Sequence, residues 1–187
     1  MVLARSQTGT IINFPVAENV HVNGILHTTT VPTSVNAEQA QKAIQMANDI
    51  AKGLGYVGTM AVEFFVSQSG EIIANEIAPR PHNSGHYTLD ACHTSQFEQQ
   101  VRMLCGLPAG DCDLITPVVM VNLLGDVWGN SQPHWETLLS ETNIKLHLYG
   151  KQEARPGRKM GHFNVLAETV DQAMQQAGTC FENLKAD

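Results

Sequence analysis

The chain has 187 residues, enough for one generous domain or two small ones, and its 43% hydrophobic and 16% charged residues argue against disorder. A formal net charge of −7 argues against a general nucleic-acid binder, which needs a basic face. The longest apolar runs are too short to span a bilayer, and no targeting segment is recognisable, so we expect a cytoplasmic protein. The spacing of Cys92, Cys105, Cys112 and Cys180 contains no C-x-x-C pair and indicates reduced, mostly buried thiols.

In chain order, the pattern first predicts strands over residues 2–32, arranged as a hairpin and a third strand. A helix follows over residues 36–53, with Asn36 and Gln39 as its capping box. Two antiparallel strands, residues 59–66 and 71–78, are joined by the turn "SQSG".

A second helix is expected to begin at Ser95, with Glu98 completing its cap. Turn residues near "LPAGDCD" mark a boundary, which divides the chain into domains 1–108 and 109–187. The second domain is expected to be β-rich, with strands in "TPVVMVNLLG", "IKLHLYG" and "GHFNVLAE", a short helix around "PHWETLLSE", and a closing helix capped by Thr169 and Gln172. The predicted fold class is α+β.

Two acids interrupt the apolar hairpin strands. With the hairpin centred in the middle of "SQSG", Ala61 lies opposite Glu76 and Glu63 lies opposite Ala74. Because side chains alternate between faces, Glu63 and Glu76 are then diagonal neighbours on one face, with their backbones about 7–8 Å apart. Such a pair suits magnesium, which takes few carboxylates together with phosphate oxygens and water. The alternative is two acids on a solvated sheet face.

The stretch "NEIAPRPHNSGH" places many polar groups directly after the second of these strands. Arg80, His82, Asn83 and Ser84 are candidate donors to an oxyanion or a substrate carbonyl, or they stabilise the loop itself. A zinc site with His82 and His86 is a weaker interpretation, because the prolines oppose a helix and no cysteine lies close in the sequence.

Positive charge is concentrated in "KQEARPGRK", where Lys151, Arg155, Arg158 and Lys159 supply four of the eleven cations of the chain. In an acidic protein such a cluster indicates either a small-anion site or a solvated turn.

Three segments together, "VEFFV…GEIIANEIAPRPHNSGHYTLDAC", "FPVAENVHVNGIL" and "RPGRKMGH", closely resemble the 5-(carboxyamino)imidazole ribonucleotide synthase family of ATP-grasp enzymes. The resemblance covers essentially the whole chain and implies the distal lobe of an ATP-grasp domain followed by a small β-rich domain. It also implies a ligase of purine biosynthesis in which ATP and bicarbonate give carboxyphosphate and ADP. The carboxyl group then passes to the amine of aminoimidazole ribonucleotide. The full-length enzyme is expected to be a homodimer.

The resemblance implies a role for each candidate. Glu63 and Glu76 match the magnesium ligands, and His21, Asn75 and Glu76 match nucleotide-binding positions. Arg80, His82, Asn83 and Ser84 match the catalytic loop that positions bicarbonate and carboxyphosphate, and Lys151 and Arg158 match a pair that binds the phosphate of the ribonucleotide.

Two departures qualify the resemblance. Ala78 stands where many ATP-grasp enzymes have a metal-binding asparagine, and the N-terminal lobe of the family has no counterpart here. We therefore expect the C-terminal portion of the enzyme, beginning on an interior strand and inactive alone. The alternatives are a related purine ATP-grasp ligase with the same magnesium pair, or a non-catalytic binding or oligomerisation module.

Overall fold

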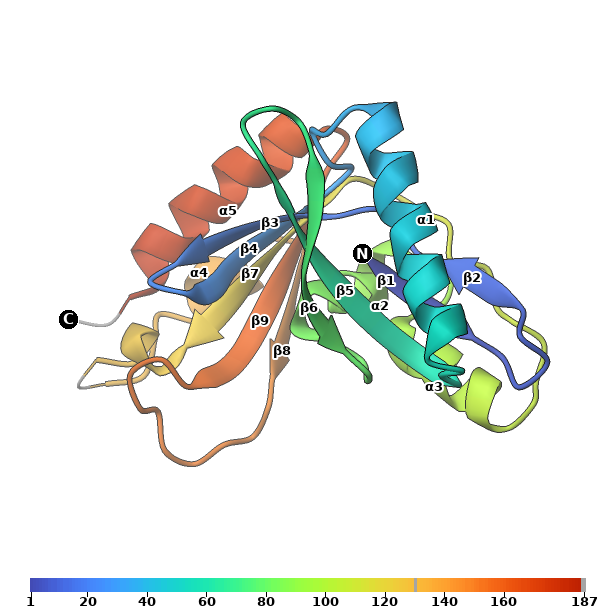
Figure 1. Cartoon of the computed structure of the whole chain (residues 1–187). Coiled ribbons are helices and arrows are strands. Elements are labelled where there is room, and N and C mark those ends of the chain that lie inside the picture. Colours follow the sequence, from blue (N-terminus) through green and yellow to red (C-terminus); the bar gives the residue numbers. More distant parts are fainter. Residues whose placement is uncertain (130, 186–187) are drawn as a thin grey trace. The chain divides into compact units, whose positions relative to one another are not determined.

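The computed structural model describes residues 1–129 and 131–185, which form two compact units (Figure 1). The first unit comprises Met1–Glu18 and Pro32–Ile115, and the second comprises Asn19–Val31 and the chain from Thr116 onward. In the described residues no helix is long and apolar enough to cross a membrane.

The first unit is built on a four-stranded antiparallel sheet with the order β2-β1-β5-β6. The strand at the start of the chain therefore lies in the interior of the sheet, between β2 and β5, as expected. The predicted hairpin of residues 59–66 and 71–78 is confirmed as β5 and β6. The four strands are β1 (Val2–Arg5), β2 (Ile11–Asn13), β5 (Gly58–Val66) and β6 (Ile72–Ala78).

Helix α1 (Ala37–Gly53) packs against one face of this sheet (Figure 1). Its capping box is complete, because the Asn36 side chain accepts from the Gln39 N–H while the Gln39 side chain accepts from the Asn36 N–H. The helix contributes Ala47 and Ala51 to a core that also contains Met1, Leu3, Met60 and Val62.

After β6 the chain forms the short helices η1 (Asn83–Gly85) and α2 (Thr88–Ala91) and then α3 (Gln96–Leu104). Ser95 caps α3 as predicted, with its hydroxyl accepting from the Glu98 N–H at 3.2 Å. The Glu98 carboxylate does not return to the cap but binds Arg102 one turn later at 2.7 Å. An oppositely charged partner four residues away competes successfully for that carboxylate.

The second unit is built on a five-stranded antiparallel sheet with the order β3-β4-β7-β9-β8. Residues 2–32 thus hold four strands, one more than predicted. The additional turn is at Asn23 and Gly24, whose φ angles of 52° and 75° suit a tight hairpin. The strands are β3 (Glu18–Val22), β4 (Ile25–Val31), β7 (Val118–Leu124), β8 (Ile144–Leu148) and β9 (Lys159–Leu166).

Helix α5 (Val170–Leu184) covers one face of this sheet, and its predicted capping box of Thr169 and Gln172 is confirmed. Two short helices, η2 (Gly125–Val127) and α4 (Glu136–Leu139), complete the unit. The shared core contains Val119, Val121, Leu123, Phe163 and Val165 from the sheet and Ala173, Ala177, Cys180 and Leu184 from the helix. Sheets and helices together confirm the α+β class.

The four cysteines are free thiols, and all but Cys105 are buried, as the spacing indicated. Burial raises the pKa of Cys92 to about 12 and that of Cys112 to about 11, so both stay protonated at neutral pH. These thiols are therefore inert parts of the first unit.

Candidate functional site

The two acids of the β5–β6 hairpin are direct cross-strand partners. Glu63 pairs with Glu76 and Ala61 pairs with Ala78, so the predicted diagonal register, with Ala61 opposite Glu76 and Glu63 opposite Ala74, is wrong. The shared face, however, is correct, because directly opposed residues project from the same side of a sheet. Direct opposition brings the Cβ atoms of the two acids closer together than the predicted diagonal arrangement would.

Two local features explain the difference. The turn holds Gly70 at a φ of 83°, and the Ser67 N–H donates to the Glu71 carbonyl, so the turn contains residues 68–70, one residue more than the predicted register allows. Asn75 then forms a β-bulge, since Glu63 pairs with Glu76 while the next residue, Phe64, already pairs with Ala74. Two one-residue shifts restore the original face, whereas either shift alone would have separated the acids.

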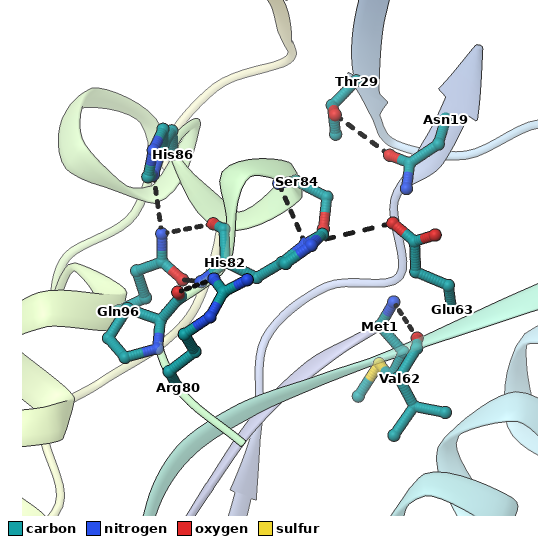
Figure 2. A network of polar contacts seen from close by, with 11 residues as sticks. Met1, Asn19, Thr29, Val62, Glu63, Arg80, His82, Ser84, His86 and Gln96 are labelled. Carbon is teal, nitrogen blue, oxygen red and sulfur yellow. Dashed lines mark hydrogen bonds and ion pairs between the residues drawn. The ribbon is translucent and has the colours of Figure 1, made fainter. Parts of the chain in front are cut away.

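Glu63 is the more buried of the pair and faces the loop that follows β6. Its Oε1 lies 3.9 Å from Nδ1 of His82, and both side chains are largely buried, with 15% and 12% of their surfaces exposed (Figure 2). The Ser84 N–H lies 3.3 Å from the same His82 Nδ1. Burial lowers the pKa of the Met1 amine to about 6, and the Glu63 carboxylate opposes that shift. Glu76, by contrast, is exposed.

In the polar loop the side chains of Arg80, His82 and Ser84 have hydrogen-bond partners, whereas the amide of Asn83 has none in the described residues. Ser84 Oγ lies 2.9 Å from His82 Nδ1, and Arg80 donates to the carbonyl of Pro81 at 3.1 Å (Figure 2). Asn83 is only 7% exposed, yet neither its Oδ1 nor its Nδ2 has a hydrogen-bond partner in the described residues. A buried amide without partners is unfavourable, and a water, an ion or a ligand that bound there would satisfy it.

Gln96, the first residue of α3, holds this loop in place. Its Oε1 accepts from the His82 N–H at 2.9 Å, and its Nε2 donates to the His82 carbonyl at 2.8 Å and lies 2.9 Å from His86 Nδ1 (Figure 2). Gln96 is fully buried, and a Cβ at Gly85 would overlap its side-chain amide. The sequence-based prediction missed Gln96. The available signal was weak: a polar residue at the first position of a capped helix.

The other candidates lie in the second unit. Lys151 and Arg158 stand near the two ends of the loop between β8 and β9. Lys151 Nζ donates to the Lys159 carbonyl at 2.6 Å, and Arg158 donates to the Glu153 carbonyl at 2.9 Å. A surface cavity of about 400 Å³ is lined by Gln152, Glu153, Arg155 and Arg158. The Glu153 carboxylate already pairs with Arg155, so the Arg158 guanidinium is the group in this cavity that is placed to bind an anion.

His21, the remaining candidate, lies on β3 in the second unit and is exposed. In residues 1–129 and 131–185 no group of three or more His, Cys, Asp or Glu side chains converges as a metal site would require. A cation at Glu63 and Glu76 would therefore take its other ligands from a substrate or from water, which is the usual arrangement for magnesium.

Two regions of the chain match known protein families. Residues 1–97 match the ATP-grasp domain family. The chain belongs to the ATP-grasp family. Residues 118–176 match a second family, the phosphoribosylaminoimidazole carboxylase C-terminal domain. The β5–β6 hairpin with its two acids is thus part of an ATP-grasp domain, and the basic loop lies in the second family's region.

The resemblance seen in the sequence is confirmed by individual relatives. N5-carboxyaminoimidazole ribonucleotide synthase of Bacillus subtilis is 49% identical over 176 residues, which cover 94% of this chain and 46% of the relative. A solved ADP complex of N5-carboxyaminoimidazole ribonucleotide synthetase is 50% identical, with a TM-score of 0.87 over 96% of this chain and 47% of the other. The Aspergillus clavatus synthase, solved with ADP and 5-aminoimidazole ribonucleotide, is 30% identical, with a TM-score of 0.87 over 97% of this chain and 49% of the other. The chain thus spans about half the length of these ATP-grasp relatives.

Proposed function

We propose that this chain provides the metal-binding and carboxyl-transfer part of an ATP-dependent ligase that carboxylates aminoimidazole ribonucleotide with bicarbonate. The single observation that carries the proposal is the juxtaposition in the first unit. A pair of directly opposed acids, Glu63 and Glu76, lies beside the loop that Gln96 holds by hydrogen bonds, and this loop contains the buried Asn83 amide, which has no partner in the described residues. The similarity to the synthases supplies the substrate class.

The chemistry of the two acids fits magnesium. Directly opposed residues of an antiparallel pair have Cβ atoms about 4.5–5.5 Å apart, and like charges in that position repel each other unless a cation lies between them. Glu63 and Glu76 would hold the ion, and phosphate oxygens and water would complete its coordination. Magnesium bound there would neutralise charge on the phosphates of ATP.

The proposed reaction has two steps. An oxygen of bicarbonate attacks the γ-phosphorus of ATP, the bond to ADP breaks, and carboxyphosphate forms. The amine nitrogen of aminoimidazole ribonucleotide then attacks the carboxyl carbon, the carbon–oxygen bond to phosphate breaks, and the amine loses a proton. Because carboxyphosphate is an unstable anion, the site must stabilise negative charge and exclude water.

The loop residues fit these requirements. The planar guanidinium of Arg80 offers paired donors to a carboxylate or phosphate, and the unpaired Nδ2 of Asn83 offers a third donor. His82 and Ser84 are hydrogen-bonded to each other, and Glu63 lies beside His82. This arrangement places the two loop residues to orient the carboxyl group of bicarbonate or carboxyphosphate. We assign bicarbonate and carboxyphosphate binding to these four loop residues.

Nucleotide binding is assigned to Asn75, Glu76 and His21. An apolar surface supports this assignment in the first unit, because the exposed pair Phe65 and Ile73 shares the sheet face of the two acids. An exposed aromatic ring beside a metal site suits the stacking of a nucleobase. Lys151 and Arg158 are assigned to the phosphate of the ribonucleotide. The full-length protein is proposed to be cytoplasmic and to be a homodimer, and the homodimer rests on the resemblance alone.

Asn83 gives a prediction that separates stability from activity. In an enzyme of full family length, Asn83→Ala is expected to change the free energy of unfolding by less than about 1 kcal/mol, because no hydrogen bond is lost and two buried unpaired atoms are removed. Carboxylation should nevertheless fall by at least about tenfold, since a donor to the reacting anion is gone. Denaturant melts and steady-state kinetics test both parts. A strongly destabilised variant, or one with unchanged turnover, would contradict the assignment.

The function as a whole is tested by measuring ADP release by the unmutated enzyme of full family length. Release should require bicarbonate, which attacks ATP in the first step, and it should be accompanied by carboxylation of aminoimidazole ribonucleotide. If ADP is released equally fast without bicarbonate and without the ribonucleotide, a different ATP-grasp reaction would be favoured.

A further inference from the structure

The basic loop between β8 and β9 is hydrogen-bonded to a turn of the second unit that lies about 30 residues earlier in the sequence. The loop contains Lys151, Arg155 and Arg158, and the turn is η2, which directly follows β7. Strand β7 lies in the interior of its sheet, between β4 and β9. Leu124, the last residue of β7, pairs with Lys159, the first residue of β9, so η2 and the end of the basic loop lie side by side.

The first contact is at Gly125. Its N–H donates to the carbonyl of Arg158 at 2.8 Å. A Cβ at this position would overlap the carbonyl oxygen of Arg155, and it would lie 2.7 Å from both the backbone carbon and the backbone nitrogen of that residue. The φ angle of Gly125 is outside the left-handed region, so an alanine could adopt this backbone conformation. Close approach of the Arg155 backbone is thus the reason for glycine here.

The second contact is at the adjacent residue. Asp126 Oδ2 accepts from the Gly157 N–H at 2.7 Å, and Gly157 has a φ of 72°, a conformation that favours glycine. Gly125 and Asp126 thus contact Arg155, Gly157 and Arg158 in succession. The loop backbone is therefore held at Arg155, Gly157 and Arg158, and the side chains of Arg155 and Arg158 line the cavity.

From these contacts we infer that Gly125 and Asp126 are positioning residues for the phosphate of the ribonucleotide. They act through the backbone of the basic loop and do not touch the substrate. The inference rests on the proposed function of Arg158. Glu153 supports the same arrangement, since its carboxylate binds Arg155 and its carbonyl accepts from Arg158. Displacement of a binding group by about 1 Å is enough to change a rate by up to about a hundredfold.

The test compares two glycines of the same unit in an enzyme of full family length. Gly125→Ala should raise the KM of aminoimidazole ribonucleotide by about tenfold or more and leave the KM of ATP within about twofold. Gly178→Ala is the matched control, because no atom lies within 4 Å of its added Cβ. This control should leave both KM values unchanged. Equal increases in both KM values for Gly125→Ala would indicate general damage and overturn the inference.

Asp126 provides a second pair of variants that does not depend on how Gly125→Ala folds. Asp126→Ala removes the acceptor for the Gly157 N–H and should raise the KM of the ribonucleotide. Asp126→Asn keeps an oxygen acceptor and should restore a KM close to the original. A normal KM in Asp126→Ala, or an equally raised KM in both variants, would overturn the inference.

Arg158→Ala separates failure of this inference from failure of the proposed function. If Arg158→Ala raises the KM of the ribonucleotide while Gly125→Ala and Asp126→Ala do not, the positioning role is wrong and the phosphate role stands. If Arg158→Ala leaves that KM unchanged, the phosphate role itself is wrong.

Discussion

Glu76→Gln is expected to abolish most magnesium-dependent ATP cleavage in an enzyme of full family length while leaving the fold intact. Glu76 is exposed and is one of two directly opposed carboxylates, so its charge contributes to metal binding and little to packing. Loss of one charged metal contact should cost about 3 kcal/mol in the transition state, which corresponds to roughly a hundredfold in rate.

The matched control is Glu71→Gln, which removes an exposed acid from the turn of the same hairpin. This variant should cleave ATP at the normal rate, and both variants should melt near the parent temperature. Near-normal turnover in the Glu76→Gln enzyme would contradict the metal assignment. Equal losses in both variants would show that net charge, not the opposed pair, is what matters.

Arg158→Ala should weaken binding of aminoimidazole ribonucleotide and have little effect on ATP. A charge-assisted contact to phosphate is worth about 1.5–3 kcal/mol, so the KM of the ribonucleotide should rise by roughly 10- to 150-fold. Initial-rate kinetics with each substrate varied in turn provide the measurement.

Lys145→Ala is the control for the loss of positive charge, because Lys145 is exposed on β8 outside the basic loop. It should leave both KM values unchanged. If Arg158→Ala lowers the affinity for ATP alone, the loop binds nucleotide and the phosphate assignment is wrong.

Features determined by residues close in sequence were predictable. The capping boxes at Asn36 and Thr169 each depend on a partner three residues away, and both are present. The β5–β6 hairpin followed from alternation and a glycine-containing turn. The missed β3–β4 hairpin belongs to the same class, since Asn23 and Gly24 are a recognised signal for a tight turn.

Other features depend on details that alternation does not encode. The bulge at Asn75 changed the register of the two acids from diagonal to directly opposed, because pairing patterns alone do not locate an extra residue. Gln96 and Gly125 were missed for a different reason. Their partners lie 14 and about 30 positions away, and only the folded chain brings them together. Residue types that suit the site were therefore readable, whereas the residues that hold them in place were not.

The most direct test of the central claim is the fate of an oxygen atom. If carboxyphosphate forms, the bicarbonate oxygen that attacks ATP remains on phosphorus when the carboxyl group moves to the amine. Freshly dissolved bicarbonate labelled with oxygen-18 should therefore transfer a single labelled oxygen to each phosphate released during carboxylation. An isotope shift in the phosphorus NMR spectrum would reveal it. Unlabelled phosphate, released at the same rate as the carboxylated product, would contradict the proposed reaction.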